Sequence, residues 1–115
     1  MLEALNDHLE AISLRDIDRF ADTLAADDVR FVGGDGKILE GKENVVSAHR
    51  EWFMAQNWRF DPEILWTREE AGTGLALTRV RYTESDRTRE FLLLFIFADE
   101  DGSWKLLYDQ NTPIA

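Results

Sequence analysis

The sequence predicts an α+β domain in which helices come first and an antiparallel sheet follows. Two observations support this prediction. Apolar residues recur at helical spacing in the first half of the chain, beginning with Leu2, Leu5 and Leu9. In the second half, apolar or alternating runs are separated by short polar turns, as in strands joined by hairpins. Helices followed by such strands favour a sheet with helices on one face, and 115 residues suit a single domain over residues 1–115.

The first half of the chain contains two helical stretches separated by a short hairpin. The apolar stripe of residues 2–24 predicts one long helix with a break near residues 13–15, or two helices end to end. Ser13 and Asp16 resemble a capping box, with Asp in place of the usual Glu. Residues 29–32 and 37–40 form two short strands around the glycine-rich turn 33–36. A second helix follows over residues 42–56, with Val45, Trp52 and either Ala48 or His49 on its apolar face.

Four longer strands are predicted in the second half. They cover residues 58–68, 75–84, 89–97 and 104–112, and Pro113 ends the last one. Pro62 within the first of them indicates an edge strand or a bulge, because proline cannot donate to a neighbouring strand. Residues 91–97 carry no polar side chain on either face. Both faces of this strand therefore need a cover, and we expect helices on one side and a second copy of the chain on the other.

Composition excludes several classes of function. The chain has no cysteine, so disulfides, a thiol nucleophile and cysteine metal sites are excluded. A net charge of −10 argues against nucleic acid and against anionic membrane surfaces as partners. No apolar run is long enough to cross a bilayer, and residues 1–10 are acidic and amphipathic, unlike a signal peptide. A cytoplasmic location is the resulting expectation.

A set of landmarks in fixed order resembles a known superfamily. They are residues 15–20 (Arg-Asp-Ile-Asp-Arg-Phe), 26–29 (Ala-Asp-Asp-Val), 35–41 (Asp-Gly-Lys-Ile-Leu-Glu-Gly), Trp52-Phe53, and 101–113 (Asp-Gly-Ser-Trp-Lys-Leu-Leu-Tyr-Asp-Gln-Asn-Thr-Pro). The chain resembles the SnoaL-like and DUF4440-like members of the nuclear transport factor 2 superfamily, which includes ketosteroid isomerase. The resemblance implies a cone-shaped, strongly curved antiparallel sheet wrapped around the N-terminal helices, with an apolar pocket inside and an outer face that is commonly a dimer interface.

By the same analogy, one set of strand residues faces the pocket and the other faces outward. The inward set is Thr78, Val80, Tyr82, Leu92, Leu94, Ile96, Leu107, Asp109 and Asn111. The outward set is Leu75, Leu77, Phe91, Leu93, Phe95, Phe97, Trp104, Leu106 and Tyr108. An exposed apolar surface of that size would drive association, so we expect a homodimer through the outer face of the sheet. The alternative is a monomer whose C-terminal strands are covered by loops.

Steroid-type isomerisation is disfavoured by the residues at the positions that the resemblance assigns to it. Such enzymes need a carboxylate base and neutral donors for an enolate oxygen. The base position falls at about Gly33, the oxyanion tyrosine at about His8 and the second oxyanion acid at about Leu94. The carboxylate base and the second oxyanion acid are therefore missing, and a histidine stands in place of the tyrosine.

A carboxyl group beside apolar walls has a raised pKa, which suits a general acid or base, and Asp109 is the residue that we expect to act as the base. His8 is the candidate proton donor at the pocket floor, and Tyr82 or Asn111 the candidate orienting groups. The alternatives are a locally paired Asp109, a buried His8 bonded to a neighbour and a core Tyr82. Trp52 is expected in the pocket wall or in the core.

We interpret His49 as structural. A two-histidine metal site with Asp109 is geometrically conceivable, but the sequence fixes no third ligand and contains no metal-binding spacing motif, so no metal and no cofactor is predicted.

The function expected from the sequence is that of a SnoaL-like domain binding a small apolar organic molecule. If the protein is an enzyme, the chemistry is cofactor-independent acid–base work: isomerisation, cyclisation or dehydration. The alternative is a non-catalytic dimerisation or ligand-binding module. The sequence leaves open which of the two applies.

Overall fold

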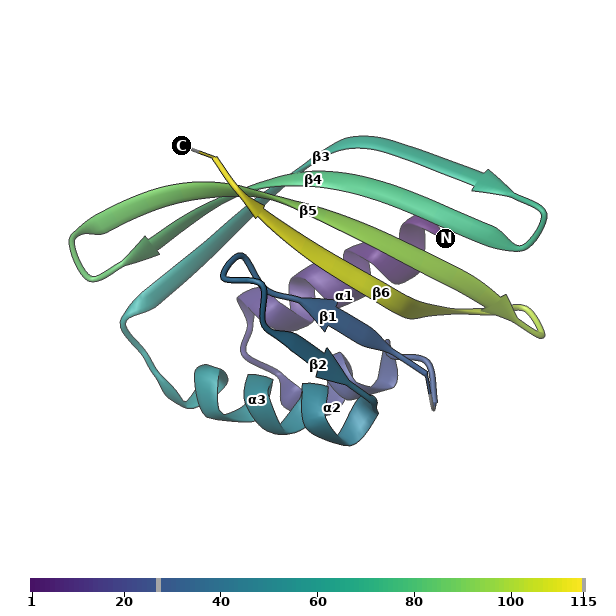
Figure 1. Ribbon diagram of the computed structural model, residues 1–115, viewed down its shortest axis with the longest axis horizontal. Coiled ribbons are helices and arrows are strands. Elements are labelled where there is room, and N and C mark those ends of the chain that lie inside the picture. The colour runs from purple at the N-terminus through teal and green to yellow at the C-terminus, as the bar shows by residue number, and fades with distance from the viewer. Residues whose placement is uncertain (27, 115) are drawn as a thin grey trace.

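The computed structural model describes residues 1–26 and 28–114 as an α+β fold (Figure 1). Its helices are α1 (Leu2–Ser13), α2 (Ile17–Asp22) and α3 (Lys42–Met54). Its strands are β1 (Arg30–Val32), β2 (Ile38–Glu40), β3 (Trp58–Glu70), β4 (Thr73–Glu84), β5 (Arg87–Glu100) and β6 (Ser103–Pro113). The predicted order of helices and strands is confirmed.

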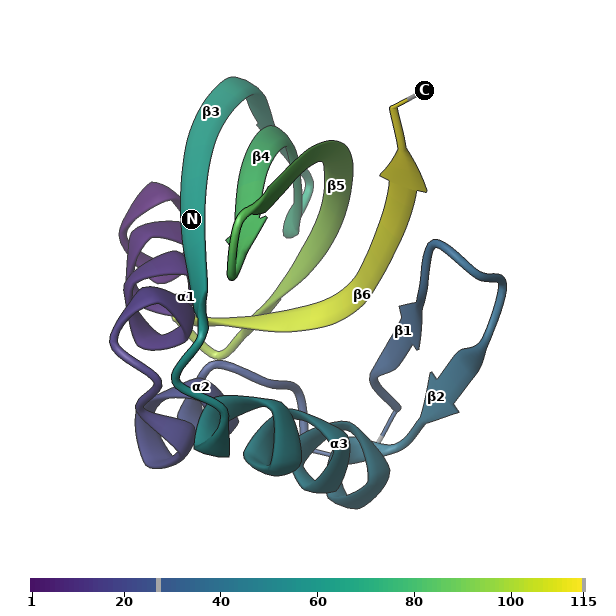
Figure 2. The same ribbon diagram turned by 90° about the vertical axis from the view of Figure 1, so that its left-hand side faces the viewer.

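The six strands form one curved sheet in the order β2-β1-β6-β5-β4-β3. Neighbouring strands are antiparallel except β1 and β6, which run parallel, a pairing that the sequence did not indicate. The long strands bend over the helices, and α1 lies inside the curve (Figures 1 and 2). The cone-like fold class is thereby confirmed. β3 is an edge strand, which is how it accommodates Pro62.

The break in the N-terminal helical stretch is real and separates α1 from α2. Arg15 adopts a positive φ of 56°, which ends the first helix. The second begins at Asp16, whose carboxylate accepts a hydrogen bond from the Arg19 backbone N–H at 3.2 Å. The predicted capping box starting at Ser13 is wrong, because Ser13 is the last residue of α1 and its hydroxyl donates to the Phe60 carbonyl at 3.3 Å.

The predicted inward row of β5 is wrong by one residue. The hairpin between β4 and β5 has two connecting residues and pairs Glu84 with Arg87, so every even-numbered residue of β4 faces an odd-numbered residue of β5. Because Val80 is buried on the concave face, its partner Phe91 lies on that face too. The concave row of β5 is therefore Phe91, Leu93, Phe95 and Phe97, whereas Leu92, Leu94 and Ile96 lie on the convex face, half-buried.

A bulge in β6 changes which residues of the last strand face the core. Ile96 pairs with Tyr108 but Phe97 pairs with Leu106, which leaves Leu107 as the extra residue. Leu106 is completely buried, against the prediction that it faces outward, and Leu107 is only half-buried. Trp104 also packs against the core instead of facing outward. Beyond the bulge, Asp109 is buried on the concave face beside Phe95, and the predicted inward parity holds there.

The core lies between the concave face and the helices. Its fully buried side chains come from all layers and include Leu5, Phe20, Val45, Val80, Phe95 and Leu106. Among the described residues, no helix is both long enough and apolar enough to cross a membrane.

Replacing the adjacent leucines of the bulge tests the corrected register. Leu106→Ala removes a completely buried side chain and should lower the free energy of unfolding by about 2–5 kcal/mol. Leu107→Ala removes a half-buried one and should cost about 1 kcal/mol. Urea unfolding of the two variants measures the difference. Equal losses, or a larger loss for Leu107→Ala, would contradict the register.

Candidate functional site

A cavity of about 230 Å³ opens on the concave side, between α3, the β1–β2 hairpin and the middle of the sheet. Its apolar walls come from six elements and include Ile12, Phe31, Leu39, Trp52, Phe60, Phe91 and Leu93. The polar side chains that line it are Asp35, Lys37, His49, Asp109 and Asn111. A small set of polar groups within apolar walls is the usual composition of a small-molecule site.

Asp109 lies at the centre of the sheet on the cavity wall. Phe31 of β1 and Phe95 of β5 are its direct cross-strand neighbours. The residue is 6% exposed, and its carboxyl group makes no hydrogen bond with any described residue. Burial without a compensating partner raises the pKa of the Asp109 carboxyl to about 8. At neutral pH the group is therefore a neutral acid that can donate a proton.

His49 of α3 lines the same cavity. Its Nδ1 lies 2.7 Å from the Val45 carbonyl oxygen, which can only accept, so Nδ1 carries the proton and Nε2 keeps a lone pair. The ring stacks on Phe20 with centroids 4.4 Å apart. Burial lowers the pKa of His49 to about 4, and the bond to Val45 acts weakly in the opposite direction. The imidazole is thus a neutral proton acceptor at pH 7.

Trp52 forms an aromatic wall that is fixed by its neighbours. Its Nε1 donates to the Tyr82 hydroxyl at 3.0 Å, and its ring stacks on Trp58 with centroids 4.3 Å apart. Tyr82 in turn donates to Glu84 at 3.5 Å. Tyr82 does not line the cavity, so the expected contact between its hydroxyl and a ligand is wrong. Burial raises the pKa of Tyr82, which keeps the hydroxyl protonated while it holds Trp52.

His8 is buried behind the cavity wall and does not line the cavity. Its Nδ1 lies 2.7 Å from the Thr23 hydroxyl. Burial, together with the nearby His49, lowers the pKa of His8 to about 3. A neutral imidazole whose N–H is already used cannot be the proton donor that the sequence suggested for a ligand.

The remaining predicted pocket residues divide into three groups. Trp52 and Asn111 line the cavity. Thr78 and Val80 face the same side but are completely buried in the core. Outside the concave face lie Leu92, Leu94, Ile96 and Leu107.

His49 is the site residue that sequence reasoning missed. It follows Val45 by four positions and precedes Trp52 by three, which places all three on one face of α3. That spacing was visible in the sequence, but it equally allowed Ala48 on the apolar face. The parallel pairing of β1 with β6, which brings Phe31 beside Asp109, left no sequence signal.

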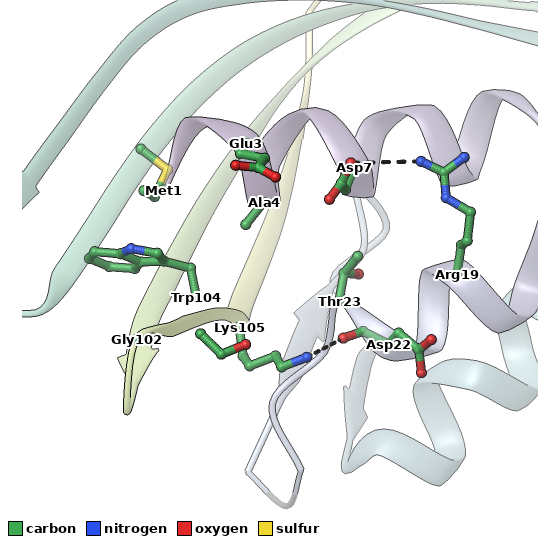
Figure 3. Close-up of a pocket in the computed structure, with 11 residues that line it drawn as sticks. Met1, Glu3, Ala4, Asp7, Arg19, Asp22, Thr23, Gly102, Trp104 and Lys105 are labelled. Atoms are coloured by element: carbon green, nitrogen blue, oxygen red, sulfur yellow. Dashed lines mark hydrogen bonds and ion pairs between the residues drawn. The ribbon is translucent and has the colours of Figure 1, made fainter.

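A larger cleft of about 490 Å³ lies on the other side of α1, lined by residues of α1, α2 and the start of β6 (Figure 3). Its two cationic side chains are already engaged: Arg19 pairs with Asp7 at 3.7 Å, and Lys105 Nζ donates to the Asp22 carbonyl at 2.6 Å. Open to solvent and internally paired, it offers less for chemistry than the smaller cavity. Within the described part of the chain, no three His, Asp or Glu side chains converge on a common point.

Comparison with known proteins identifies relatives by family and by fold. Residues 1–113 match the family described as SnoaL-like domain. No curated protein matches the sequence.

Three solved structures illustrate the likeness in fold. A ketosteroid isomerase-like protein from Erwinia carotovora atroseptica shares 18% identity, with a TM-score of 0.83 over 98% of this chain and 92% of that one. A candidate dehydratase of the NTF2-like family from Streptomyces avermitilis shares 14%, with 0.84 over 97% and 91%. An NTF-2 like protein of unknown function from Shewanella oneidensis shares 13%, with 0.83 over 96% and 94%. At these identities the likeness establishes the fold alone.

The three buried titratable groups predict how stability depends on pH. The histidines have ordinary pKa values of 6.5 that folding lowers, so the unfolded chain binds more protons and stability rises with pH up to about 6.5. Folding raises the pKa of Asp109 from 3.8 to about 8, so its contribution falls as pH rises between these values. Below pH 6.5 the rise in stability from the two histidines is larger than the fall from Asp109. Above pH 6.5 only the fall from Asp109 remains.

The free energy of unfolding should therefore reach a maximum near pH 6.5 and fall by about 1.4 kcal/mol per pH unit from there to pH 8. Asp109→Asn should abolish the alkaline decline, because the amide cannot ionise. Urea unfolding between pH 5 and 9 measures both curves. The same decline in Asp109→Asn as in the parent protein would show that another group causes it.

Proposed function

Because the chain belongs to the SnoaL-like domain family, we propose that its cavity binds a small, mostly apolar organic molecule and transfers protons on it without a cofactor. The observation that carries this proposal is that a neutral carboxyl group, Asp109, and a neutral imidazole, His49, line one apolar cavity. A proton donor and a proton acceptor held apart from bulk water are the requirements of general acid–base catalysis.

The two groups have complementary roles. Asp109 donates its proton to a carbonyl oxygen or to a departing hydroxyl group of the substrate. His49 takes a proton through Nε2 from a carbon next to that group or from an attacking hydroxyl. One proton is given and one is taken, so isomerisation, cyclisation and dehydration all balance without another reactant. The low polarity of the walls strengthens the interaction of both groups with developing charge.

The cavity also limits the substrate. Its volume of about 230 Å³ lies below the range of roughly 300–1,000 Å³ that accommodates drug-sized ligands. Trp52 and the phenylalanines of the wall favour a flat molecule, and Asn111 offers an amide for one polar substituent. Asp109 is neutral only while no cation is beside it, so a neutral ligand fits better than a cationic one.

A homodimer is the second part of the proposal. The convex face carries an apolar surface across three strands, formed by Trp66, Leu75, Leu77, Leu92, Leu94 and Ile96. Its rim holds ion pairs, with Arg79 3.6 Å from Glu90 and Arg68 3.2 Å from Glu70. A rim of both charge signs around an apolar centre can meet its own copy through a two-fold axis without a clash of like charges. A second copy is therefore the occupant that we propose for this face.

The rival function is a non-catalytic ligand-binding or dimerisation module, and Asp109→Asn separates it from an enzyme. Small neutral carbonyl and hydroxyl compounds can be screened for turnover and, through intrinsic tryptophan fluorescence to which Trp52 of the cavity wall contributes, for binding. We expect Asp109→Asn to keep ligand affinity within about twofold, because the amide still donates a hydrogen bond, and to lose turnover by about 10²–10⁴-fold. Asp61→Asn, on the exposed edge strand, is the matched control. Binding with no turnover in the parent protein would support the non-catalytic module.

Association is tested by placing a charge on the convex face. Leu94→Glu should convert the dimer to a monomer, because two carboxylates would be buried at the interface. The parent dimer should tighten as salt screens the net charge of −10 on each copy. Sedimentation velocity over a concentration series measures both effects. A parent protein that remains monomeric at high concentration and high salt would disprove the interface.

A further inference from the structure

His8 is a buried polar group that the proposed acid–base chemistry leaves unused. The Thr23 hydroxyl donates to the Phe20 carbonyl at 2.7 Å, so its oxygen can only accept from the imidazole. Nδ1 of His8 therefore carries the proton. The other ring nitrogen, Nε2, is a buried lone pair that has no hydrogen-bond partner among the described residues. Burying an unsatisfied acceptor lowers stability, so this nitrogen calls for an explanation.

Two of the rings around His8 belong to the row of residues that contains Asp109. Phe31, Asp109 and Phe95 are consecutive members of one row across β1, β6 and β5. The His8 ring lies 6.5 Å from the Phe31 ring and 5.4 Å from the Phe95 ring, centroid to centroid. His8 therefore lies near the two rings that flank Asp109 in this row. With Nδ1 turned to Thr23, Nε2 is the nitrogen left without a partner.

The opposite end of this arrangement reaches solvent. Thr23 lines the open cleft, where Figure 3 shows it between Asp7 and Asp22. The cleft and the catalytic cavity have no lining residue in common. Thr23 therefore links His8 to the open cleft, whereas Asp109 lines the separate cavity.

We propose that His8 and Thr23 form a proton relay between Asp109 and the solvent in the open cleft. In the outward direction the Asp109 O–H bond breaks as an Nε2–H bond forms on His8. The Nδ1–H bond breaks as that proton passes to the Thr23 oxygen, and the hydroxyl turns its own proton from the Phe20 carbonyl to water in the cleft and releases it there. The products are a carboxylate, a neutral imidazole with its proton on Nε2, and one proton in solution. The inward direction is the reverse.

The relay rests on the proposed role of Asp109 and explains how that residue changes charge while a ligand fills the cavity. A ligand would cover the small exposed part of Asp109 and leave no direct path to water. His8 and Asp109 are not hydrogen-bonded to each other in the structure, so transfer requires a rotation of the carboxyl group or an intervening water. Their geometry makes His8 a positioning and relay residue and not one that touches substrate.

The charged groups near the relay are few. His49 is the titratable group whose charge acts on His8, and it disfavours a charged imidazole. At the cleft, Asp7, Asp22, Arg19 and Lys105 surround Thr23. Because the pKa of His8 is lowered to about 3, the imidazolium does not accumulate, and the relay passes between two neutral tautomers.

Nuclear magnetic resonance of protein labelled with ¹⁵N in histidine and ¹³C in aspartate tests the relay without a substrate. We expect the Asp109 carboxyl to titrate near pH 8 and the His8 proton to move from Nδ1 to Nε2 with the same midpoint. In Asp109→Asn the proton should stay on Nδ1 at every pH. If Asp109 titrates near pH 8 while His8 does not change tautomer, the relay is disproved and the acid of the proposed function stands. If Asp109 titrates near 3.8, both are overturned.

Two variants of Thr23 test the outer step. Thr23→Val removes the hydroxyl at nearly constant shape and should slow proton exchange on Asp109 at least about tenfold, measured from line broadening of its carboxyl carbon near the midpoint. Thr23→Ser keeps a hydroxyl and should exchange at close to the parent rate. Equal exchange rates in the Val and Ser variants would show that protons reach Asp109 by another route, and the relay would be wrong.

Discussion

Exclusion of water from the concave face of the sheet is the constraint on which the rest of the structure depends. The long strands curve over α1 and bring phenylalanine rings around three titratable side chains, His8, His49 and Asp109. None of the three has an opposite charge beside it, so each is neutral at pH 7 and its pKa moves away from the ordinary value. The same desolvation that stabilises the aromatic core thus creates an acid and two bases.

The fold was predictable because its signals are local. Helical spacing in the N-terminal part and hairpin-linked apolar runs in the C-terminal part defined the elements, and the two-sided apolar character of residues 91–97 indicated a sheet covered on both faces. Which residues of a strand point to the concave face could not be predicted in the same way. When both parities of a strand are apolar, only the hairpin decides between them, and a two-residue turn at Ser85 and Asp86 pairs even with odd numbers. The bulge at Leu107 shifts the parity again.

The site was predictable only in part. Asp109, Asn111 and Trp52 were expected near the pocket and do line the cavity, whereas Leu92, Leu94 and Ile96 do not. Two features lay beyond the reach of the sequence. One is the short parallel contact of β1 with β6, which places Phe31 against Asp109. The other is the choice of His49 over Ala48 on the apolar face of α3, because one helical turn accommodates either residue.

The wrong assignment of the two β5 rows to the faces of the sheet does not change the prediction that both faces are apolar. β5 is apolar in both parities, so exchanging its two rows still leaves one apolar row in the core and one on the convex face, where we propose a second copy. What the exchange alters is the surroundings of Asp109, which now has the large ring of Phe95 as its neighbour. A larger apolar neighbour removes more water from the carboxyl group. The corrected register therefore strengthens the case for a neutral acid in the cavity. Burying this acid lowers the stability of the protein, and a residue with a purely structural role would give no reason to accept that loss.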